Sequence, residues 1–135
     1  MKLDLNKIRR DLHVLEGRDV VLFGSHVRGE ARPNSDIDIA VVTRNQERSQ
    51  NFALLQSMIG VFHPIYDLKI YELLPLKIQK AIADEFFPIF GDPLELSEYF
   101  YFYRKRWVDC KHRILENSFT SYVDQMQALK ANKKG

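Results

Sequence analysis

Asp36 and Asp38 are the residues of this sequence whose type and spacing point most directly to chemistry. They lie at the start of an apolar segment that ends at Val42, and such a segment predicts a β-strand. Side chains two positions apart on a strand project from the same face, so we expect the two carboxylates to lie side by side. Because like charges repel, a fold that keeps them together is typical of a divalent-cation site. We therefore predict that both aspartates bind Mg²⁺.

A glycine–serine turn lies upstream of the acidic pair. Gly24 and Ser25 follow the apolar run Val20–Phe23, and ten residues separate Ser25 from Asp36. Glycine lets the backbone approach phosphate oxygens closely, and a helix that begins there offers free N–H groups. The Ser25 hydroxyl could bind a phosphate oxygen or could simply cap that helix. Together with the acids, the turn predicts a site for a nucleoside triphosphate.

Two further side chains belong to the predicted site. Arg28, one turn into the expected helix, could pair with a phosphate or with an acid on the following loop. Asp67 lies on a later predicted strand, where its carboxylate could bind a metal ion or take the proton of an attacking hydroxyl. The alternative for Asp67 is an ion pair with Lys69 or a nearby arginine. These residue types fit nucleotidyl transfer, which depends on positioning and charge neutralisation.

Helices and strands alternate along the sequence in the order α-β-α-β-α-β-α-β-α. This order predicts an α/β (α+β) fold, with a small mixed sheet flanked by helices. We expect a single domain over residues 1–135, with a catalytic core at about 17–91 and a C-terminal helical segment at about 94–131. The expected helices cover 4–16, a short stretch after Gly24, 46–60, 76–82 and the C-terminal segment, and the expected strands cover 19–23, 36–43, 64–71 and 86–90.

The composition is that of an ordinary globular protein and excludes several classes. Apolar residues make up 45% and charged residues 28%, and the net charge of +2 is too small to argue for nucleic acid as a direct partner. The single cysteine, Cys110, excludes an internal disulfide and a cysteine-based zinc site. The sequence has no long apolar run and no signal-peptide pattern at its N-terminus, so we expect no membrane span and a cytoplasmic location.

The motif resembles that of a known family. Gly24-Ser25-x-x-Arg28-Gly29 followed by Ser35-Asp36-Ile37-Asp38 is similar to the signature of the DNA polymerase β-like nucleotidyltransferase superfamily, and in particular of its minimal nucleotidyltransferase (MNT) branch. Asp67-Leu68 and the segment 86–90 resemble the family's third-acid strand and the segment after that strand. The resemblance implies that the catalytic and metal-binding residues are Asp36, Asp38 and Asp67, and that the nucleotide-binding residues are Gly24, Ser25, Arg28 and Ser35.

The resemblance also implies an activity. Many MNT proteins are antitoxins of HEPN-domain ribonucleases, and the resemblance implies transfer of AMP from ATP, with Mg²⁺, to a tyrosine of such a toxin, as in a type VII toxin–antitoxin pair. About 65 residues, mostly in predicted helices, follow Asp67, so we expect the acceptor to arrive on another molecule. Two alternatives stay open: an antitoxin that acts by binding alone, and a nucleotidyltransferase that acts on a small molecule or an RNA.

An aromatic run, Tyr99–Tyr103, lies on the predicted C-terminal helix. Five consecutive helical side chains point in every direction, so some of them must face away from the core. The pattern favours core packing first, a surface for a homo- or hetero-oligomer second, and stacking on nucleic acid bases last.

Overall fold

The structure, a computed structural model, describes residues 3–32 and 35–110. The chain divides into two compact units, Met1–Arg104 and Lys105–Gly135. In the second unit the structure describes residues 105–110, all of which are helical. The rest of the predicted C-terminal helical segment, 111–131, lies outside the described residues.

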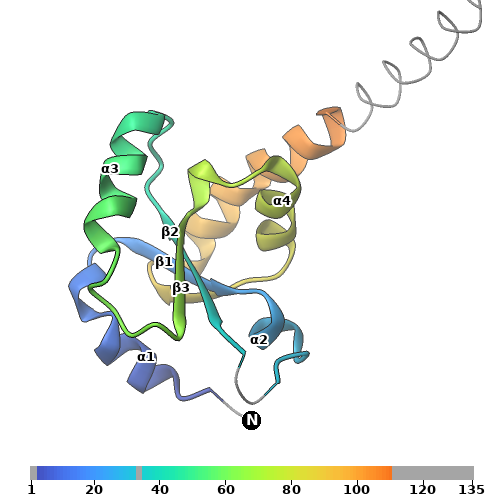
Figure 1. Cartoon of the computed structure of the whole chain (residues 1–135). Helices are drawn as coiled ribbons and strands as arrows, with labels where there is room; N and C mark the ends of the chain where they lie inside the picture. Colours follow the sequence, from blue (N-terminus) through green and yellow to red (C-terminus); the bar gives the residue numbers. More distant parts are fainter. Residues whose placement is uncertain (1–2, 33–34, 111–135) are drawn as a thin grey trace, which may run out of the picture. The chain divides into compact units, whose positions relative to one another are not determined.

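A four-stranded mixed sheet forms the centre of the first unit and confirms the predicted fold class (Figure 1). Its strands are β1 (Asp19–Phe23), β2 (Ile37–Val42), β3 (Tyr66–Ile70) and β4 (Phe87–Phe90), in the spatial order β3-β2-β1-β4. β1 runs antiparallel to both β2 and β4, and β2 runs parallel to β3. Each strand forms where the sequence has the apolar run that predicted it, although β3 ends at Ile70 because a short 3₁₀ helix, η2 (Tyr71–Leu73), follows it directly.

The helices also follow the sequence pattern, with one break. They are α1 (Leu5–Asp11), η1 (His13–Leu15), α2 (Ser25–Arg28), α3 (Arg48–Met58), α4 (Leu76–Asp84) and a helix that covers 93–110. The prediction of a single helix over 4–16 is therefore wrong, because this segment changes at Leu12 from α-helical to 3₁₀ geometry. In a 3₁₀ turn, side chains three positions apart lie on one side, and Leu12 and Leu15 are both buried against the sheet.

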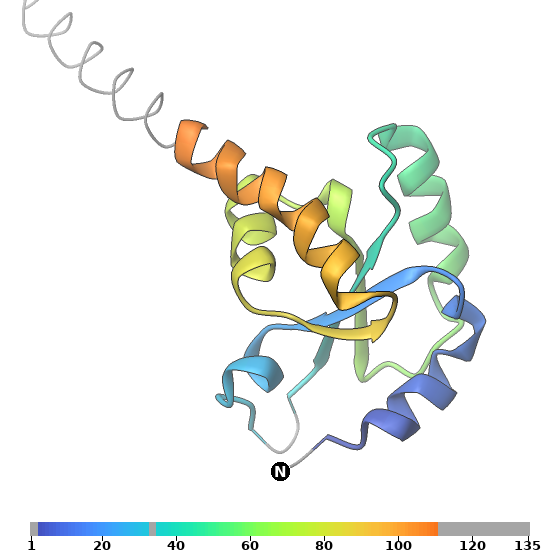
Figure 2. The ribbon, with the colours of Figure 1, turned by 180° about the vertical axis from the view of Figure 1, so that it is seen from behind.

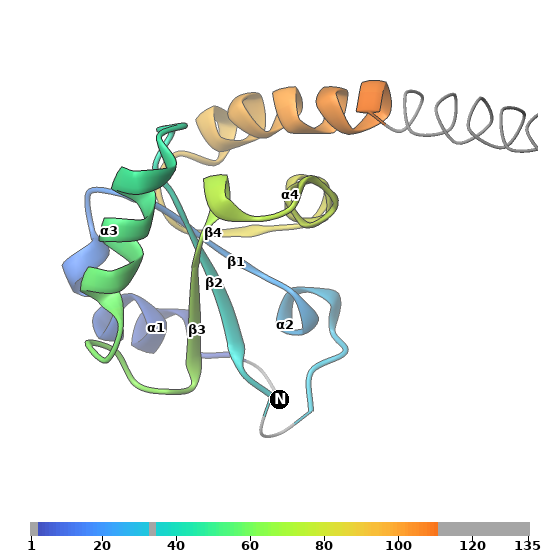
Figure 3. The same ribbon diagram turned by 45° about the horizontal axis from the view of Figure 1, so that its top comes forward.

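Two apolar clusters cover the two faces of the sheet. One joins α1 and α3 to alternate residues of the strands, among them Val20, Leu22, Ile39 and Val41. The other joins α4 and the helical residues 96–103 to the strand residues that alternate with these, Val21, Ala40 and Val42. Figure 2 shows α4 and the helix from residue 93 lying over one face, and Figure 3 shows α1 on the other. Because both faces are covered, the polar positions in β2 and β3 are exceptions that need an explanation.

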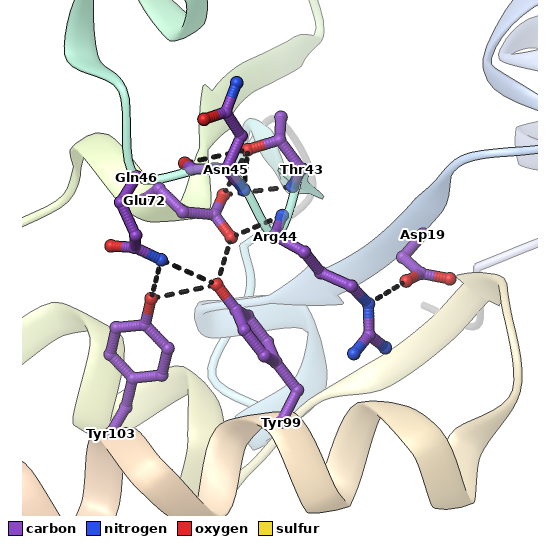
Figure 4. Close-up of polar contacts among 8 residues, drawn as sticks. All are labelled: Asp19, Thr43, Arg44, Asn45, Gln46, Glu72, Tyr99 and Tyr103. Carbon is purple, nitrogen blue, oxygen red and sulfur yellow. Dashed lines mark hydrogen bonds and ion pairs between the residues drawn. The ribbon is translucent and has the colours of Figure 1, made fainter.

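A buried carboxylate ties the helix from residue 93 to the end of β2 (Figure 4). Glu72 accepts hydrogen bonds from the backbone N–H groups of Thr43 and Arg44, each at 3.0 Å, and from the Tyr99 hydroxyl at 2.7 Å. Arg44, with a φ of +57°, donates from Nε to Asp19 Oδ2 at 2.9 Å, and its guanidinium lies 4.8 Å from the centre of the Tyr99 ring. The network thereby connects segments that are far apart in the sequence.

The aromatic run divides between core and surface, as the helical geometry requires. Phe100 and Tyr103 are buried, whereas Tyr101 and Phe102 are 58% and 63% exposed. Core packing is therefore confirmed for part of the run, and the exposed pair leaves the predicted association surface open. No helix among the described residues combines the length and the apolar character that a membrane span requires.

Candidate functional site

Asp38 and Asp67 are direct neighbours on adjacent parallel strands. The β2–β3 register pairs Asp38 with Asp67, Ile39 with Leu68 and Ala40 with Lys69. Strand alternation puts Asp38 on the same face as Ala40, whose side chain packs in the cluster under α4. Neighbouring strands lie about 4.8 Å apart, so the two carboxyl groups face the α4 side of the sheet together.

The electrostatics of this pair favour a bound cation. Burial raises the pKa of Asp38 above its ordinary value, and the charge of Asp67 raises it further. Lys69 acts in the opposite direction on the pKa of Asp38, and its Nζ lies 3.6 Å from Asp67 Oδ2. The predicted alternative for Asp67, an ion pair with Lys69, is thus present beside the acidic pair. A divalent cation between the carboxylates would relieve the repulsion that a single lysine only partly offsets.

Asp36 lies one residue before β2, and the prediction that it shares a face with Asp38 stays a prediction. It is exposed, and the cross-strand neighbour of Asp38 is Asp67. Its charge nevertheless contributes to the raised pKa of Asp38. Within residues 3–32 and 35–110, no three histidine, cysteine, aspartate or glutamate side chains are grouped as a ready-made metal site. Two carboxylates suit Mg²⁺, which keeps waters and takes phosphate oxygens from its substrate.

Gly24 brings the turn after β1 against this acidic pair. Its φ is +83°, and a Cβ at this position would overlap Asp38 Oδ2 and stand 3.0 Å from Asp38 Cγ. The register of β1 with β2 causes this approach, because Phe23 pairs with Asp38. Gly24 is the N-cap residue of α2, and no side chain caps that helix. The interpretation of Ser25 as a simple helix cap is therefore wrong, while its role as a phosphate ligand stays a prediction.

The other two predicted nucleotide ligands are Arg28, the last residue of α2, and Ser35, which lies shortly before β2. Arg28 donates from Nε to Glu30 Oε2 at 3.2 Å, which is the loop pairing that the sequence allowed for it. Ser35 Oγ accepts a hydrogen bond from the backbone N–H of Arg32 at 2.8 Å, and His26 Nε2 lies 3.2 Å from the Ser35 carbonyl oxygen. Both predicted ligands therefore have partners within the loop, and their contact with a nucleotide stays a prediction.

A cleft of about 400 Å³ lies between Asp38 and α4. At the sheet end it is lined by Phe23, Gly24, Arg28 and Asp38. Along α4 it is lined by Ile78, Ala81, Ile82, Asp84 and Glu85. Sequence reasoning missed the α4 wall, because apolar periodicity predicts a helix over 76–82 without showing which apolar positions stay outside the core. The usable signal is that Ile78 and Ala81 lie off the buried face, which carries Gln79, Ile82 and Ala83.

Replacing Gly24 with alanine is expected to disrupt the site more than the fold. The added Cβ displaces the Asp38 carboxyl and is strained at a positive φ, at a cost of about 1–3 kcal/mol. We expect Gly24→Ala to lose Mg²⁺-dependent ATP binding in calorimetry. The matched control is Gly29→Ala, which has a φ of +73° but no neighbour within 4 Å. Equal ATP affinities for the two variants would contradict a role for the close approach of Gly24 to Asp38.

The mixed sheet, the glycine turn after its first strand and the acidic residues on the next two strands define a nucleotidyltransferase. The chain belongs to the nucleotidyltransferase domain family, whose model matches residues 4–105. It is 43% identical over 107 residues to "Putative protein adenylyltransferase MJ1547" of Methanocaldococcus jannaschii, covering 79% of this chain and 83% of that protein. The chain is therefore a nucleotidyltransferase enzyme, similar to a protein adenylyltransferase.

Solved structures show the same fold at low sequence identity. One, described as "Crystal structure of the toxin-antitoxin with AMP-PNP", has a TM-score of 0.60 at 20% identity and covers 87% of this chain and 99% of that chain. Another contains a tri-AMPylated Shewanella oneidensis HEPN toxin in complex with an MNT antitoxin, with a TM-score of 0.53 at 16% identity, covering 85% of this chain and 95% of that chain.

Proposed function

We propose that this protein transfers AMP from ATP, with Mg²⁺, to a hydroxyl of a HEPN-domain toxin, and that the acceptor is a tyrosine. The observation that carries the proposal is the in-register pair Asp38–Asp67, packed against the close approach of Gly24. The similarity to a protein adenylyltransferase supports a protein acceptor. The structural neighbours, which are toxin–antitoxin complexes with a nucleotide analogue or a HEPN toxin, support the choice of partner.

Each residue of the site has a task in this reaction. The Gly24 backbone admits the β- and γ-phosphates close to the turn, with the Ser25 hydroxyl as a further donor to phosphate oxygen. Asp38 and Asp36 hold Mg²⁺, which when bound neutralises phosphate charge and orients the α-phosphate for in-line attack. The tyrosine oxygen then forms a bond to the α-phosphorus while the bond to the pyrophosphate oxygen breaks. Asp67, beside Asp38, holds metal or accepts the tyrosine proton.

The experiment that tests the proposal measures label transfer from ATP, labelled with ³²P at the α-phosphate, to a HEPN-domain toxin supplied as the acceptor protein. With Mg²⁺ and both proteins, we expect the toxin to be labelled in a stoichiometric and chelator-sensitive manner. Asp67→Asn keeps the shape of the side chain but removes its charge and basicity, so we expect transfer to fall by about a hundredfold or more. Glu95→Gln, which neutralises an exposed carboxylate outside the cleft, should retain full transfer.

Failure of the wild-type protein to label the toxin, or undiminished labelling by Asp67→Asn, would contradict the proposal. Mass spectrometry of the labelled toxin then identifies the acceptor residue. AMP on a residue other than tyrosine would contradict the proposal that the acceptor is a tyrosine. Labelling of an RNA or a small hydroxyl compound without the toxin would favour the alternative of a nucleotidyltransferase that acts on a small molecule or an RNA.

A second candidate is neutralisation by binding alone, and the exposed pair Tyr101 and Phe102 favours it. These side chains lie on the helix from residue 93, together with Ser97 and Glu98, around an apolar hollow of about 510 Å³. Such a surface fits a homo- or hetero-oligomeric contact. The same set of variants separates the two candidates, because an antitoxin that acts only by occlusion would still neutralise the toxin when it carries Asp67→Asn.

A further inference from the structure

We infer that the free edge of β3 is the docking site for the acceptor segment of the partner protein, which pairs with this edge as an added strand. The inference deepens the proposed function and rests on it, because it takes a tyrosine of another protein as the acceptor. β3 is the outermost strand on one side of the sheet, in the order β3-β2-β1-β4. Figure 1 shows α3 to one side of β3 and α4 to the other, so these helices flank the strand rather than extend the sheet beyond it.

The backbone groups of Leu68 point outward from this edge. The Ile37 N–H donates to the Ile65 carbonyl oxygen at 2.8 Å, which fixes the residues of β3 that bond to β2. In a parallel ladder these are every second residue, so Asp67 turns its N–H and C=O groups toward β2. The N–H and C=O of Leu68 and the N–H of Ile70 therefore face away from the sheet. Among the residues that the structure describes, no turn, cap or side chain bonds to these three groups.

The opposite edge of the sheet is protected against such pairing. β4 contains Pro88, which has no N–H to donate. The Ile89 carbonyl oxygen accepts a hydrogen bond from Arg9 Nε at 3.0 Å, and the β1–β4 register is irregular between Val20 and Val21. Proline, bulges and covering side chains are the means by which proteins protect an edge strand. The chain thus protects one edge and leaves open the edge that carries Asp67.

An added strand would place its own side chains beside Asp67. Asp67 and Lys69 lie on the α4 face of the sheet, because they pair with Asp38 and Ala40. A residue opposite Asp67 on the added strand shares this face, with the two Cβ atoms about 5 Å apart. A tyrosine at that position lies next to the carboxylate that, in the proposed reaction, holds metal or accepts the tyrosine proton. Lys69 favours an acidic side chain two positions away from that tyrosine.

The chemistry of this edge selects an extended backbone as the ligand. In strand addition, main-chain hydrogen bonds supply affinity and alternate side chains supply specificity. The ladder also holds the acceptor residue at a fixed distance from Asp67, which is the positioning that group transfer requires. The position of Asp67 on the edge strand argues for the acceptor segment over a second copy of this chain, because the acceptor must reach this place and a second copy need not.

Replacing Leu68 with proline tests this mode of docking. Proline removes the outward N–H and leaves the ladder to β2 intact, because the bonds of that ladder fall on the residues to either side. Leu68→Ala is the matched control, since it shortens the same side chain and keeps the N–H. The rate of AMP transfer is measured at saturating ATP and Mg²⁺ over a range of concentrations of a HEPN-domain toxin. Calorimetry gives the dissociation constant for ATP.

We expect Leu68→Pro to raise the KM for the toxin by about tenfold or more. One hydrogen bond to the added strand is lost, and the proline ring stands where that strand must approach. Its dissociation constant for ATP in the presence of Mg²⁺ should match that of the wild-type protein, which also shows that the variant is folded. Leu68→Ala should keep both values within error.

Amide hydrogen exchange provides a test that depends on no variant. In the wild-type protein, the N–H groups of Leu68 and Ile70 should exchange about tenfold more slowly when the toxin is bound than in the isolated protein. The added strand accepts hydrogen bonds from these groups and shields them from water, whereas in the isolated protein they face solvent.

Three results would overturn the inference while leaving the proposed function standing. In the first, Leu68→Pro transfers AMP with the wild-type KM for the toxin. In the second, binding of the toxin leaves the exchange of the Leu68 N–H unchanged. In the third, this exchange is already slow in the isolated protein and slows further with its concentration, which shows that a second copy covers the edge. If the wild-type protein does not label the toxin, the proposed function itself fails, and the assignment of an acceptor segment to this edge fails with it.

Discussion

The Asp38→Asn variant is expected to lose nucleotidyl transfer and to gain stability. The amide that replaces the carboxylate is a poor Mg²⁺ ligand, so we expect the rate of AMP transfer to fall by about a hundredfold to a thousandfold. The same substitution removes a carboxyl group whose pKa is raised by burial and by the charges of Asp67 and Asp36. The free energy of unfolding at neutral pH should therefore rise, by about 1 kcal/mol at most because Asp38 is only half-buried and water screens the repulsion.

The sign of this effect follows from proton linkage. The pKa of Asp38 in the folded protein is above its ordinary value of 3.8, so the folded chain holds this proton more tightly than the unfolded chain does. The repulsive penalty is full at neutral pH and disappears as the pH falls below 3.8. A gain in stability for Asp38→Asn should therefore be measurable by urea unfolding at pH 7 and should vanish in acid.

The control for this prediction is Glu95→Gln, which neutralises an exposed carboxylate outside the cleft. It should leave both the transfer rate and the urea midpoint within error of the wild-type values. An Asp38→Asn protein that is less stable than the wild-type protein would show that the carboxylate has a structural role. Retained transfer would show that Asp38 is not a metal ligand.

Local sequence was enough to predict the strands and the turn of the site. Each apolar run became a strand, and the glycine after the first of them marks the place where the backbone approaches Asp38. Such features depend on residues within a few positions of one another, and short-range sterics and strand alternation determine them. The same rules identified Asp38 and Asp67 as acids on adjoining predicted strands.

The pairing of the acids could not be predicted in the same way. Spacing predicts that Asp36 and Asp38 share a face, whereas the pairing of Asp38 with Asp67 comes from the register of two parallel strands. Two parallel strands are joined by a long crossover, here the segment with α3, so the residue that lies opposite Asp38 is separated from it by many positions in the sequence. The α4 wall was missed for a similar reason, because only the packed structure shows that Ile78 is left outside the core.

Long-range polar contacts are the least predictable part of the fold. Glu72 follows a strand and would be taken for a surface residue, yet it is only 9% exposed. Its oxygens receive the first two backbone N–H groups after β2, together with the hydroxyl of Tyr99 (Figure 4). A glutamate beside an apolar strand carries no sign of such partners, since they come from segments that only the folded chain brings together.

Removing this carboxylate is expected to have the largest effect on stability of any change considered. In Glu72→Ala the N–H groups of Thr43 and Arg44 lose their acceptor in a partly buried site, and the Tyr99 hydroxyl loses the acceptor that lies 2.7 Å away. Each buried donor left unsatisfied costs about 1–3 kcal/mol, and water that enters the space recovers part of this. We therefore expect the free energy of unfolding to fall by about 3 kcal/mol, measured by urea denaturation.

Two control variants show how much of this loss in the free energy of unfolding comes from the backbone N–H groups. Tyr99→Phe removes only one of the donors and should cost about 1 kcal/mol. Glu98→Ala removes an exposed glutamate and should change the free energy by less than about 0.5 kcal/mol. A Glu72→Ala protein no less stable than Tyr99→Phe would mean that water replaces the carboxylate fully. In that case the backbone after β2, including Arg44 with its φ of +57°, is held by its other contacts rather than by Glu72.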